Sequence, residues 1–278
     1  MSTQSIRRAE AFRALHAAPA PLVLLNAWDA ASAAVFARAG APALATTSAG
    51  VAWTMGHRDG ERLAFADLLR TVANICRVVE RPISVDLEHG YAVDAAAVAR
   101  NAAALIDAGA IGVNIEDGID PTTQALRPAR ETVERIVAIR TAAHARGVPL
   151  FVNARTDVYF LPAQHADRSF GEAARRLEQY AAAGADGVFV PGLVDTGEIA
   201  KLVARVPLPV NVYAGYAGVP PIAELAAAGV RRISVGCGPL QGLLGHAEAM
   251  ARELLHEGRY DAMLEGALSA ASVDGLFP

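Results

Sequence analysis

The sequence predicts an α/β protein built as a (β/α)8 TIM barrel, in which eight parallel strands form a closed ring inside a layer of helices. Three observations support this fold class. Eight short apolar runs alternate with helical patterns over roughly 250 residues, the usual size of this barrel. The phrase Ala-Gly-(Ala/Val) recurs four times, and each copy closes a helical pattern and opens an apolar run. The runs are continuously apolar, which is typical of parallel strands buried on both faces.

The expected strands follow two kinds of break. Four of them come after the Ala-Gly phrase, and the other four begin after proline or a similar interruption. In chain order they are residues 22–26, 43–48, 82–88, 112–117, 150–156, 187–192, 209–215 and 231–236. A doubly wound open sheet is the alternative, but no glycine-rich phosphate fingerprint follows the first run.

The segments between the strands keep apolar residues three and four positions apart, as in Val133, Ile136 and Val137, which predicts helices. The clearest cover residues 63–79, 94–108, 173–181, 196–205, 220–228 and 243–256. One further helix is expected before the barrel, over residues 4–16, and one after it, over residues 260–271. No linker or change of composition interrupts this order, so we expect residues 1–278 to form a single domain.

The composition excludes several classes of protein. Hydrophobic residues make up 53% and the net charge is −4, which excludes a disordered chain. Cys76 and Cys237 are the only cysteines, too few for a disulfide framework. The 25 Lys+Arg are outnumbered by 29 Asp+Glu and form no basic run, so nucleic acid is not an expected partner. The single lysine, Lys201, lies in an expected surface helix and argues against Schiff-base chemistry.

Membrane and export signals are also absent from the sequence. No apolar stretch reaches about 18 residues without a charge or a break, so no transmembrane helix is expected. Residues 1–13 are polar and charged and contain no apolar signal segment. We therefore expect a cytoplasmic protein without a membrane partner.

Three carboxylates at neighbouring strand ends point to a metal ion. Asp86 and Glu88 are two positions apart, which predicts that they share one face of a strand, and Glu116 lies at the matching depth of the next strand. Three carboxylates at one rim would repel each other without a cation. Oxygen ligands without a nearby Cys or His pair favour Mg²⁺, with Mn²⁺ as the alternative.

Groups suited to an anionic ligand follow the adjacent strands. Arg155 is placed to hold a carboxylate or a developing oxyanion. The small residues Ser48, Ala49 and Gly50 would let backbone N–H groups approach an anion, and Asn211 and Tyr213 lie on the seventh strand. The small-molecule partner is therefore expected to carry a carboxylate.

Structural roles compete with these functional ones. As single acids at strand ends, Asp117 and Asp157 are more typical of helix caps or ion-pair partners than of functional groups. Arg155 alone is compatible with a structural ion pair, and Asn211 with satisfying buried backbone groups. Cys237 is expected to be a small packing residue.

Six short segments together resemble the isocitrate lyase/phosphoenolpyruvate mutase superfamily, in its branch similar to carboxyvinyl-carboxyphosphonate phosphorylmutase and methylisocitrate lyase. The resemblance covers about residues 20 to 240. The order and spacing of the segments are more specific together than any one segment alone. The segments are residues 26–33 (NAWDAASA), 47–52 (TSAGVA), 56–59 (GHRD), 85–91 (VDLEHGY), 114–117 (NIED) and 153–157 (NARTD).

The resemblance implies a Mg²⁺-dependent barrel enzyme that acts on 2-oxo or 2-hydroxy acids through an enolate or a related oxyanion. Asp86 would then ligate the metal, while Asp59, Glu88 and Glu116 would hold its water ligands. Arg155 and the Ser48–Gly50 turn would bind the substrate carboxylate and oxyanion. Arg155, Asp59 and Glu116 would form the catalytic set. Trp28, Asn211 and Tyr213 would complete the substrate pocket.

The resemblance also implies a homo-oligomer, a tetramer or a dimer. In such enzymes the last barrel helix is exchanged between neighbouring subunits. Here residues 243–256 and the helix after them would serve that exchange.

One departure from the superfamily limits the reaction. Its lyases carry a catalytic cysteine in the loop after the fourth strand, and its mutases use a lysine and an asparagine there. Residues 118–127 of this chain contain none of these. We therefore expect a lyase or decarboxylase that cleaves a C–C bond in a small 2-oxo or 2-hydroxy di-acid. A phosphonomutase or phosphonate hydrolase is the first alternative, and a non-catalytic 2-oxo acid binding barrel is the second.

Overall fold

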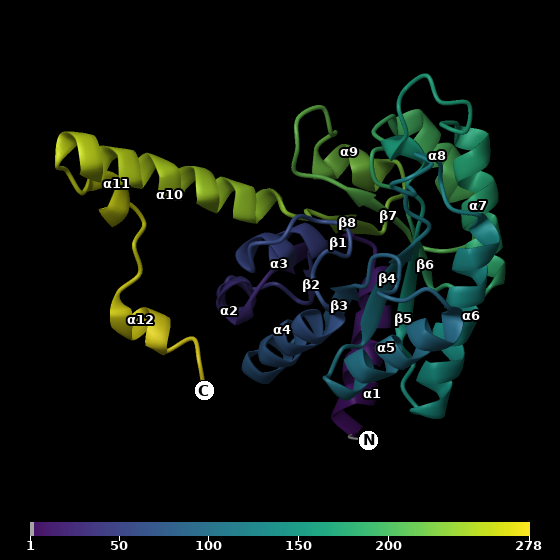
Figure 1. Ribbon diagram of the computed structural model, residues 1–278, viewed down its shortest axis with the longest axis horizontal. Coiled ribbons are helices and arrows are strands. Elements are labelled where there is room, and N and C mark those ends of the chain that lie inside the picture. The colour runs from purple at the N-terminus through teal and green to yellow at the C-terminus, as the bar shows by residue number, and fades with distance from the viewer. Residues whose placement is uncertain (1–2) are drawn as a thin grey trace.

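The computed structural model describes residues 3–278 and confirms the predicted barrel. Eight parallel strands close into one ring in chain order, and β8 pairs with β1 through Arg232 and Leu22 (Figure 1). All eight lie where the sequence predicts strands, although most are shorter than the apolar runs. They are β1 (Leu22–Ala27), β2 (Leu44–Thr46), β3 (Ile83–Asp86), β4 (Gly112–Glu116), β5 (Phe151–Arg155), β6 (Gly187–Phe189), β7 (Val210–Tyr213) and β8 (Arg232–Ser234).

Helices cover the outside of the ring, and the Ala-Gly phrases end four of them as predicted. Gly40, Gly109, Gly184 and Gly229 have φ of +99°, +107°, +100° and +91°, a conformation that glycine adopts without a Cβ clash. The helices are α1 (Thr3–Ala17), α2 (Ala30–Arg38), α3 (Ser48–Thr54), α4 (Phe65–Val78), α5 (Ala95–Asp107), α6 (Ala129–Ala145), the 3-10 turn η1 (Val158–Phe160), α7 (Phe170–Ala182), α8 (Thr196–Arg205), α9 (Ile222–Ala227), α10 (Gly238–Glu257), α11 (Asp261–Leu264) and α12 (Ala270–Asp274).

The predicted C-terminal helix and the predicted end of the second strand are both wrong. The expected helix over residues 260–271 is two short helices, because the backbone is extended at Glu265 and left-handed at Gly266. The second strand ends before Ser48, which instead begins α3. The Thr47 side chain caps α3 by accepting a hydrogen bond from the Gly50 N–H.

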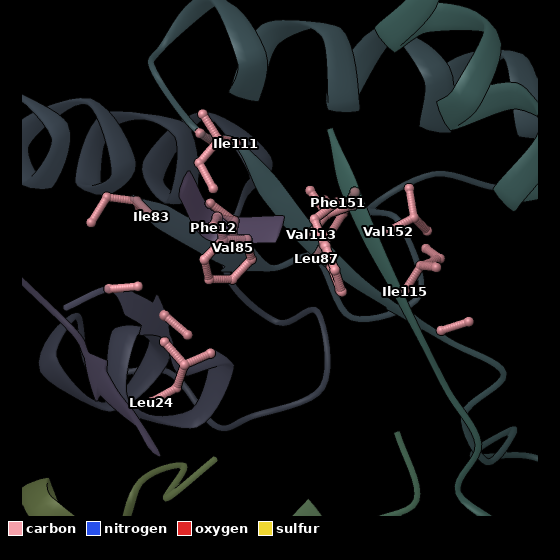
Figure 2. Packing of buried hydrophobic residues seen from close by; sticks show 14 of the residues in the cluster. Phe12, Leu24, Ile83, Val85, Leu87, Ile111, Val113, Ile115, Phe151 and Val152 are labelled. Carbon is pink, nitrogen blue, oxygen red and sulfur yellow. The ribbon is translucent and has the colours of Figure 1, made fainter. Parts of the chain in front are cut away.

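The two faces of the barrel strands carry different side chains. Val85, Val113 and Val152 face outward and belong to the apolar core that packs against the helices (Figure 2). The alternate positions face the barrel interior and are largely polar. Asn153 donates to the Asn114 side chain at 2.9 Å, and Arg232 donates to the same Asn114 oxygen at 3.2 Å.

Helix α1 closes the N-terminal end of the barrel (Figure 1). Phe12 lies edge-on to Phe151, the first residue of β5, with ring centres 5.4 Å apart. The His16 ring stacks on the same phenylalanine at 4.1 Å. With this end filled, the C-terminal ends of the strands are left to form a site.

Helix α10 carries the chain away from the barrel and is followed by the short helices α11 and α12. These three helices form a C-terminal extension, which Figure 1 shows in yellow. Apart from Leu240, none of the described residues of α10 is buried. Its large exposed apolar side chains are those of Leu243, Leu244, Leu254 and Leu255. Exchange of this helix between subunits stays a prediction. Within residues 3–278 no helix has both the length and the apolar character needed to cross a membrane, α10 included.

Candidate active site

A cavity of about 190 Å³ opens at the C-terminal end of the barrel, where six of the predicted site residues meet. These six are Ser48, Ala49, Asp59, Asp86, Arg155 and Tyr213. The rest of its wall consists of Asn26, Thr47, Asn114, Phe160, Phe189, Pro191, Ser234, Gly236 and Cys237. We call this cavity the central pocket.

Arg155, the last residue of β5, is held from two sides. Its guanidinium group lies 2.8 Å from Glu116 Oε2 and donates from Nε to Asp157 Oδ1 at 2.6 Å. The rings of Phe160 and Phe189 lie 5.4 and 5.7 Å away. Burial alone would lower the pKa of Arg155, but the two carboxylates outweigh it and raise the pKa above its ordinary value. Arg155 is therefore a fixed, permanently charged group on the pocket wall.

Asp86, the last residue of β3, has one carboxylate oxygen that no described residue contacts by a hydrogen bond. Oδ2 accepts a hydrogen bond from the Ser48 N–H at 3.2 Å, whereas buried Oδ1 accepts none from the described residues. Asp59 lies beside it, and burial and the Asp86 charge both raise the pKa of Asp59. Two adjacent carboxylates with a free buried oxygen are a suitable donor set for a hard divalent cation.

Glu88 does not share a strand face with Asp86, contrary to the sequence prediction. Strand β3 ends at Asp86, and Glu88 has φ of +49°, which turns the backbone. Its carboxylate accepts hydrogen bonds from the Tyr91 hydroxyl and, at 2.8 Å, from the Glu61 N–H. Burial is the main cause that raises the pKa of Glu88 to about 7.

Glu88 and Glu116 line a second cavity of about 460 Å³, while Asp59 lines both this cavity and the central pocket. The predicted metal ligands are thus divided between two adjoining spaces. Among residues 3–278, no three His, Cys, Asp or Glu side chains form a ready-made metal site. This arrangement fits an ion that keeps most of its ligands as water, as Mg²⁺ does in proteins.

Three predicted substrate-binding residues support the pocket without lining it. A Cβ at Gly50 would come 2.6 Å from Thr47 Cγ2 and 3.1 Å from Trp28 Cβ, so glycine lets α3 pack closely. Trp28 is buried against Phe36. Asn211 lies inside the barrel, where it donates to Ser234 Oγ at 3.1 Å.

Asn26 is a structural part of the pocket that was not among the site residues predicted from sequence. Its Oδ1 accepts from the N–H groups of Val235 and Gly236, at 3.0 and 2.9 Å, and its Nδ2 donates to Thr46 O at 2.8 Å. One side chain therefore ties the ends of β1, β2 and β8 together. Its place at the end of the first strand run is the signal that would have found it.

Cys237, Phe160 and Phe189 were also missed as pocket residues. Cys237 lies on the wall, with its Sγ 4.0 Å from the Tyr213 hydroxyl, and so is more than the packing residue expected from sequence. The two phenylalanines are indistinguishable from core residues by sequence alone.

Residues 118–127 form a closed hairpin. Ile119 and Leu126 pair as an antiparallel bridge, and Arg127 N–H donates to Gly118 O at 3.1 Å. Asp120 closes the tip by accepting from two backbone N–H groups and from Arg127. The hairpin lines the second cavity but contributes no side chain to the central pocket.

A buried ion pair fixes the base of this hairpin. Asp117 is fully buried and accepts from Thr156 Oγ1 at 2.6 Å and from the Asp157 N–H at 2.9 Å. Arg176, on α7, donates to Asp117 Oδ2 at 3.0 Å and to Arg127 O at 2.8 Å, so it holds both ends of the hairpin. Asp117 and Asp157 are thus ion-pair partners, one of the two structural roles expected for them.

Comparisons with known proteins cover the barrel and most of α10. Residues 12–255 match the model of the phosphoenolpyruvate phosphomutase family. An uncharacterized protein of Mycobacterium tuberculosis is 39% identical over 248 residues, which is 87% of either chain. The 2-methylisocitrate lyase of Salmonella typhimurium is 32% identical over 210 residues, 73% of this chain and 69% of the relative. A Burkholderia cenocepacia J2315 structure, provisionally assigned as a phosphonomutase, has a TM-score of 0.84 and 44% identity, and the match covers 90% of this chain and 99% of that one.

Proposed function

This chain belongs to the phosphoenolpyruvate phosphomutase family, and we propose that it is a Mg²⁺-dependent lyase or decarboxylase. Its substrate would be a small 2-oxo or 2-hydroxy di-acid, cleaved at a C–C bond through an enolate. The observation that carries the proposal is the central pocket, in which a fixed arginine and a carboxylate with a free oxygen line one small space.

Asp86 would hold the metal ion directly, because its Oδ1 is buried and has no hydrogen-bond partner among residues 3–278. Asp59, together with Glu88 and Glu116 in the second cavity, would hold water ligands of that ion. The donors are all carboxylate oxygens, which suit Mg²⁺ or Mn²⁺. When bound, the ion supplies Lewis-acid polarisation of a substrate oxygen.

Arg155 would bind the substrate carboxylate and stabilise the oxyanion that develops on the adjacent carbon. Glu116 and Asp157 hold its guanidinium in one orientation, so little reorganisation is needed when charge develops. The rings of Phe160 and Phe189 lie 5.4 and 5.7 Å from that group, and apolar neighbours lower the local dielectric constant and so strengthen its electrostatic effect.

The enolate left by C–C cleavage needs a proton at carbon. The hairpin of residues 118–127 supplies none to the central pocket, because it contributes no side chain there. The proton must therefore come from water or from a group on the pocket wall, of which Tyr213 is one.

Phosphonate chemistry is the second candidate, and the solved structure provisionally assigned as a phosphonomutase supports it. A binding barrel without turnover is the third, and the hairpin without a proton donor supports that reading. These candidates make different predictions for the same purified protein.

The experiment offers oxaloacetate, branched C4 di-acids and phosphonopyruvate to the protein, with Mg²⁺ and with EDTA. Oxo-acid products and CO₂ report C–C cleavage, and phosphorus NMR reports P–C chemistry. We expect turnover of a C4 acid that Asp86→Asn abolishes and Asp107→Asn, at a surface ion pair, leaves intact. Full turnover by Asp86→Asn would contradict the proposal, phosphonopyruvate as the sole substrate would favour the second candidate, and binding without turnover the third.

A further inference from the structure

We propose that the Cys237 thiol, oriented by the Tyr213 hydroxyl, protonates the enolate carbon in the central pocket. This inference rests on the proposed function and names a catalytic residue for it. Cys237 lines the pocket together with Asp86 and Arg155, the groups that would hold the metal and the substrate. Its Sγ lies 4.0 Å from the Tyr213 hydroxyl oxygen, within hydrogen-bonding reach of sulfur.

The other proton-bearing groups on the pocket wall are engaged elsewhere. Thr47 Oγ1 caps α3, the Ser48 side chain hydrogen-bonds to Asp59, and Ser234 Oγ donates to Asn211 inside the barrel. Asp59 lies beside Asp86, the proposed metal ligand, and is assigned to hold a water ligand of the ion. Thiols as a class are more acidic than alcohols and phenols, which suits proton transfer to carbon near neutral pH.

Tyr213 is better suited to orienting the thiol than to replacing it. Burial is the first cause, and Cys237 the second, that raise the pKa of Tyr213 to about 12. Its hydroxyl therefore keeps its proton at neutral pH and can donate a hydrogen bond to sulfur.

The backbone on either side holds Cys237 in place. A Cβ at Gly236 would come 2.6 Å from Tyr213 Cε2, so glycine lets the tyrosine ring lie against the turn that carries the thiol. Asn26 fixes the same turn by accepting from the Val235 and Gly236 N–H groups. Cys237 itself directly precedes α10. Its position thus depends on the ends of β1, β7 and β8.

The proposed step balances in atoms and charge. Loss of CO₂ breaks the C–C bond and leaves its electron pair on the enolate. The carbon then takes the thiol proton, so that a C–H bond forms, the S–H bond breaks and a thiolate remains. The Tyr213 hydroxyl donates a hydrogen bond to that thiolate until water restores its proton. Each turnover consumes one solvent proton.

Cys76 provides a matched control for Cys237. It lies on α4, does not line the central pocket, and burial raises the pKa of its thiol to about 11. The Cys76→Ala variant therefore removes a thiol without touching the proposed site.

The test uses 3-methyloxaloacetate in D₂O and measures both CO₂ release and the configuration of deuterium at C3 of the 2-oxobutanoate product. We expect one configuration from the wild type and from Cys76→Ala. In Cys237→Ala and Cys237→Ser we expect a mixture of configurations and CO₂ release slower by about tenfold or more. Tyr213→Phe should give an intermediate loss of configuration, because the thiol remains but is no longer held.

The outcomes separate the two proposals. CO₂ release with unchanged configuration and rate in Cys237→Ala would overturn the proton-donor assignment alone. Absence of CO₂ release from the wild type would overturn the proposed function and the assignment with it. Alkylation of folded Cys76→Ala protein by iodoacetamide gives a readout that needs no turnover. Reaction at Cys237 that oxalate slows supports the assignment, and reaction that oxalate leaves unchanged would contradict it.

Discussion

At the residue scale, Arg155 shows why the site needs arginine rather than lysine. Its planar guanidinium contacts Glu116 and Asp157 at once, through different nitrogens. A lysine ammonium is a single point charge and cannot hold both carboxylates in this geometry. Arg155 is predictable from its place at a strand end, but both partners act through contacts that strand spacing alone does not reveal.

His16 is a buried, uncharged group at the closed end of the barrel. Its Nδ1–H donates to Phe12 O at 2.8 Å, and its ring stacks on Phe151. Burial first, and then the charge of Arg232, lower the pKa of His16 to about 3. In the folded protein the His16 ring therefore stays unprotonated at pH values where the same ring in the unfolded chain binds a proton.

This difference predicts an acid-sensitive stability. Because the unfolded histidine titrates near 6.5, stability is lost as pH falls from there toward 3, and about 2 kcal/mol of the free energy of unfolding is gone by pH 5. His16→Phe should remove this part of the pH dependence. Urea unfolding at pH 8 and pH 5 measures it, with exposed His144→Phe as the control. Equal pH dependence in wild type and His16→Phe would contradict the burial argument.

At the element scale, the strands were predictable and the turns after them were not. Glycine caps and apolar runs locate all eight strands because both signals are local in sequence. The predicted placement of Glu88 was wrong because Glu88 itself has a left-handed backbone conformation, which ends the strand alternation after Asp86. Cys237 was missed because it reaches the pocket wall only through its approach to Tyr213, which lies on β7 and is distant in sequence.

The hairpin of residues 118–127 depends on α7 for its anchor. Arg176 and its neighbour Arg175 both pair with Glu172, but only Arg176 reaches Asp117 and Arg127 O. Its side chain is 7% exposed, against 49% for Arg175. Breaking a buried pair leaves an uncompensated charge, whereas a surface pair contributes little.

Arg176→Met should therefore lower the free energy of unfolding by about 3 to 5 kcal/mol. Arg175→Met, on the same helix and next to the same glutamate, should lower it by less than about 1 kcal/mol. Chemical unfolding measures both values, and limited proteolysis shows whether cleavage appears first within residues 118–127. Similar stability losses in the two variants would mean that the ion pair does not anchor the hairpin.

At the scale of the whole molecule, the C-terminal extension is the part of the chain least buried by its own barrel. Leu255 of α10 is 77% exposed, and further apolar side chains follow on α11 and α12. An apolar surface of this kind on a helix that leaves the domain is typical of an interface. We propose that a second copy of the chain covers it, in keeping with the predicted homo-oligomer.

Light scattering after size exclusion tests the oligomer. The wild type should run as a dimer or tetramer, and Leu244→Arg combined with Leu255→Arg should shift it to a smaller species. Val93 is 95% exposed on a loop outside the extension, so Val93→Arg is the matched control. A monomeric wild type, or an oligomer that the double variant leaves intact, would contradict the assignment.

For the molecule as a catalyst, we propose that the central pocket binds an enolate-like anion together with a divalent metal ion. Calorimetric titration with oxalate, a flat mimic of the pyruvate enolate, tests it in the presence of Mg²⁺ and again with EDTA. We predict binding that requires Mg²⁺ and is lost in Arg155→Lys, while Arg146→Ala, at a surface ion pair, binds like the wild type. No binding in either condition, or binding that EDTA and Arg155→Lys leave unchanged, would contradict the account.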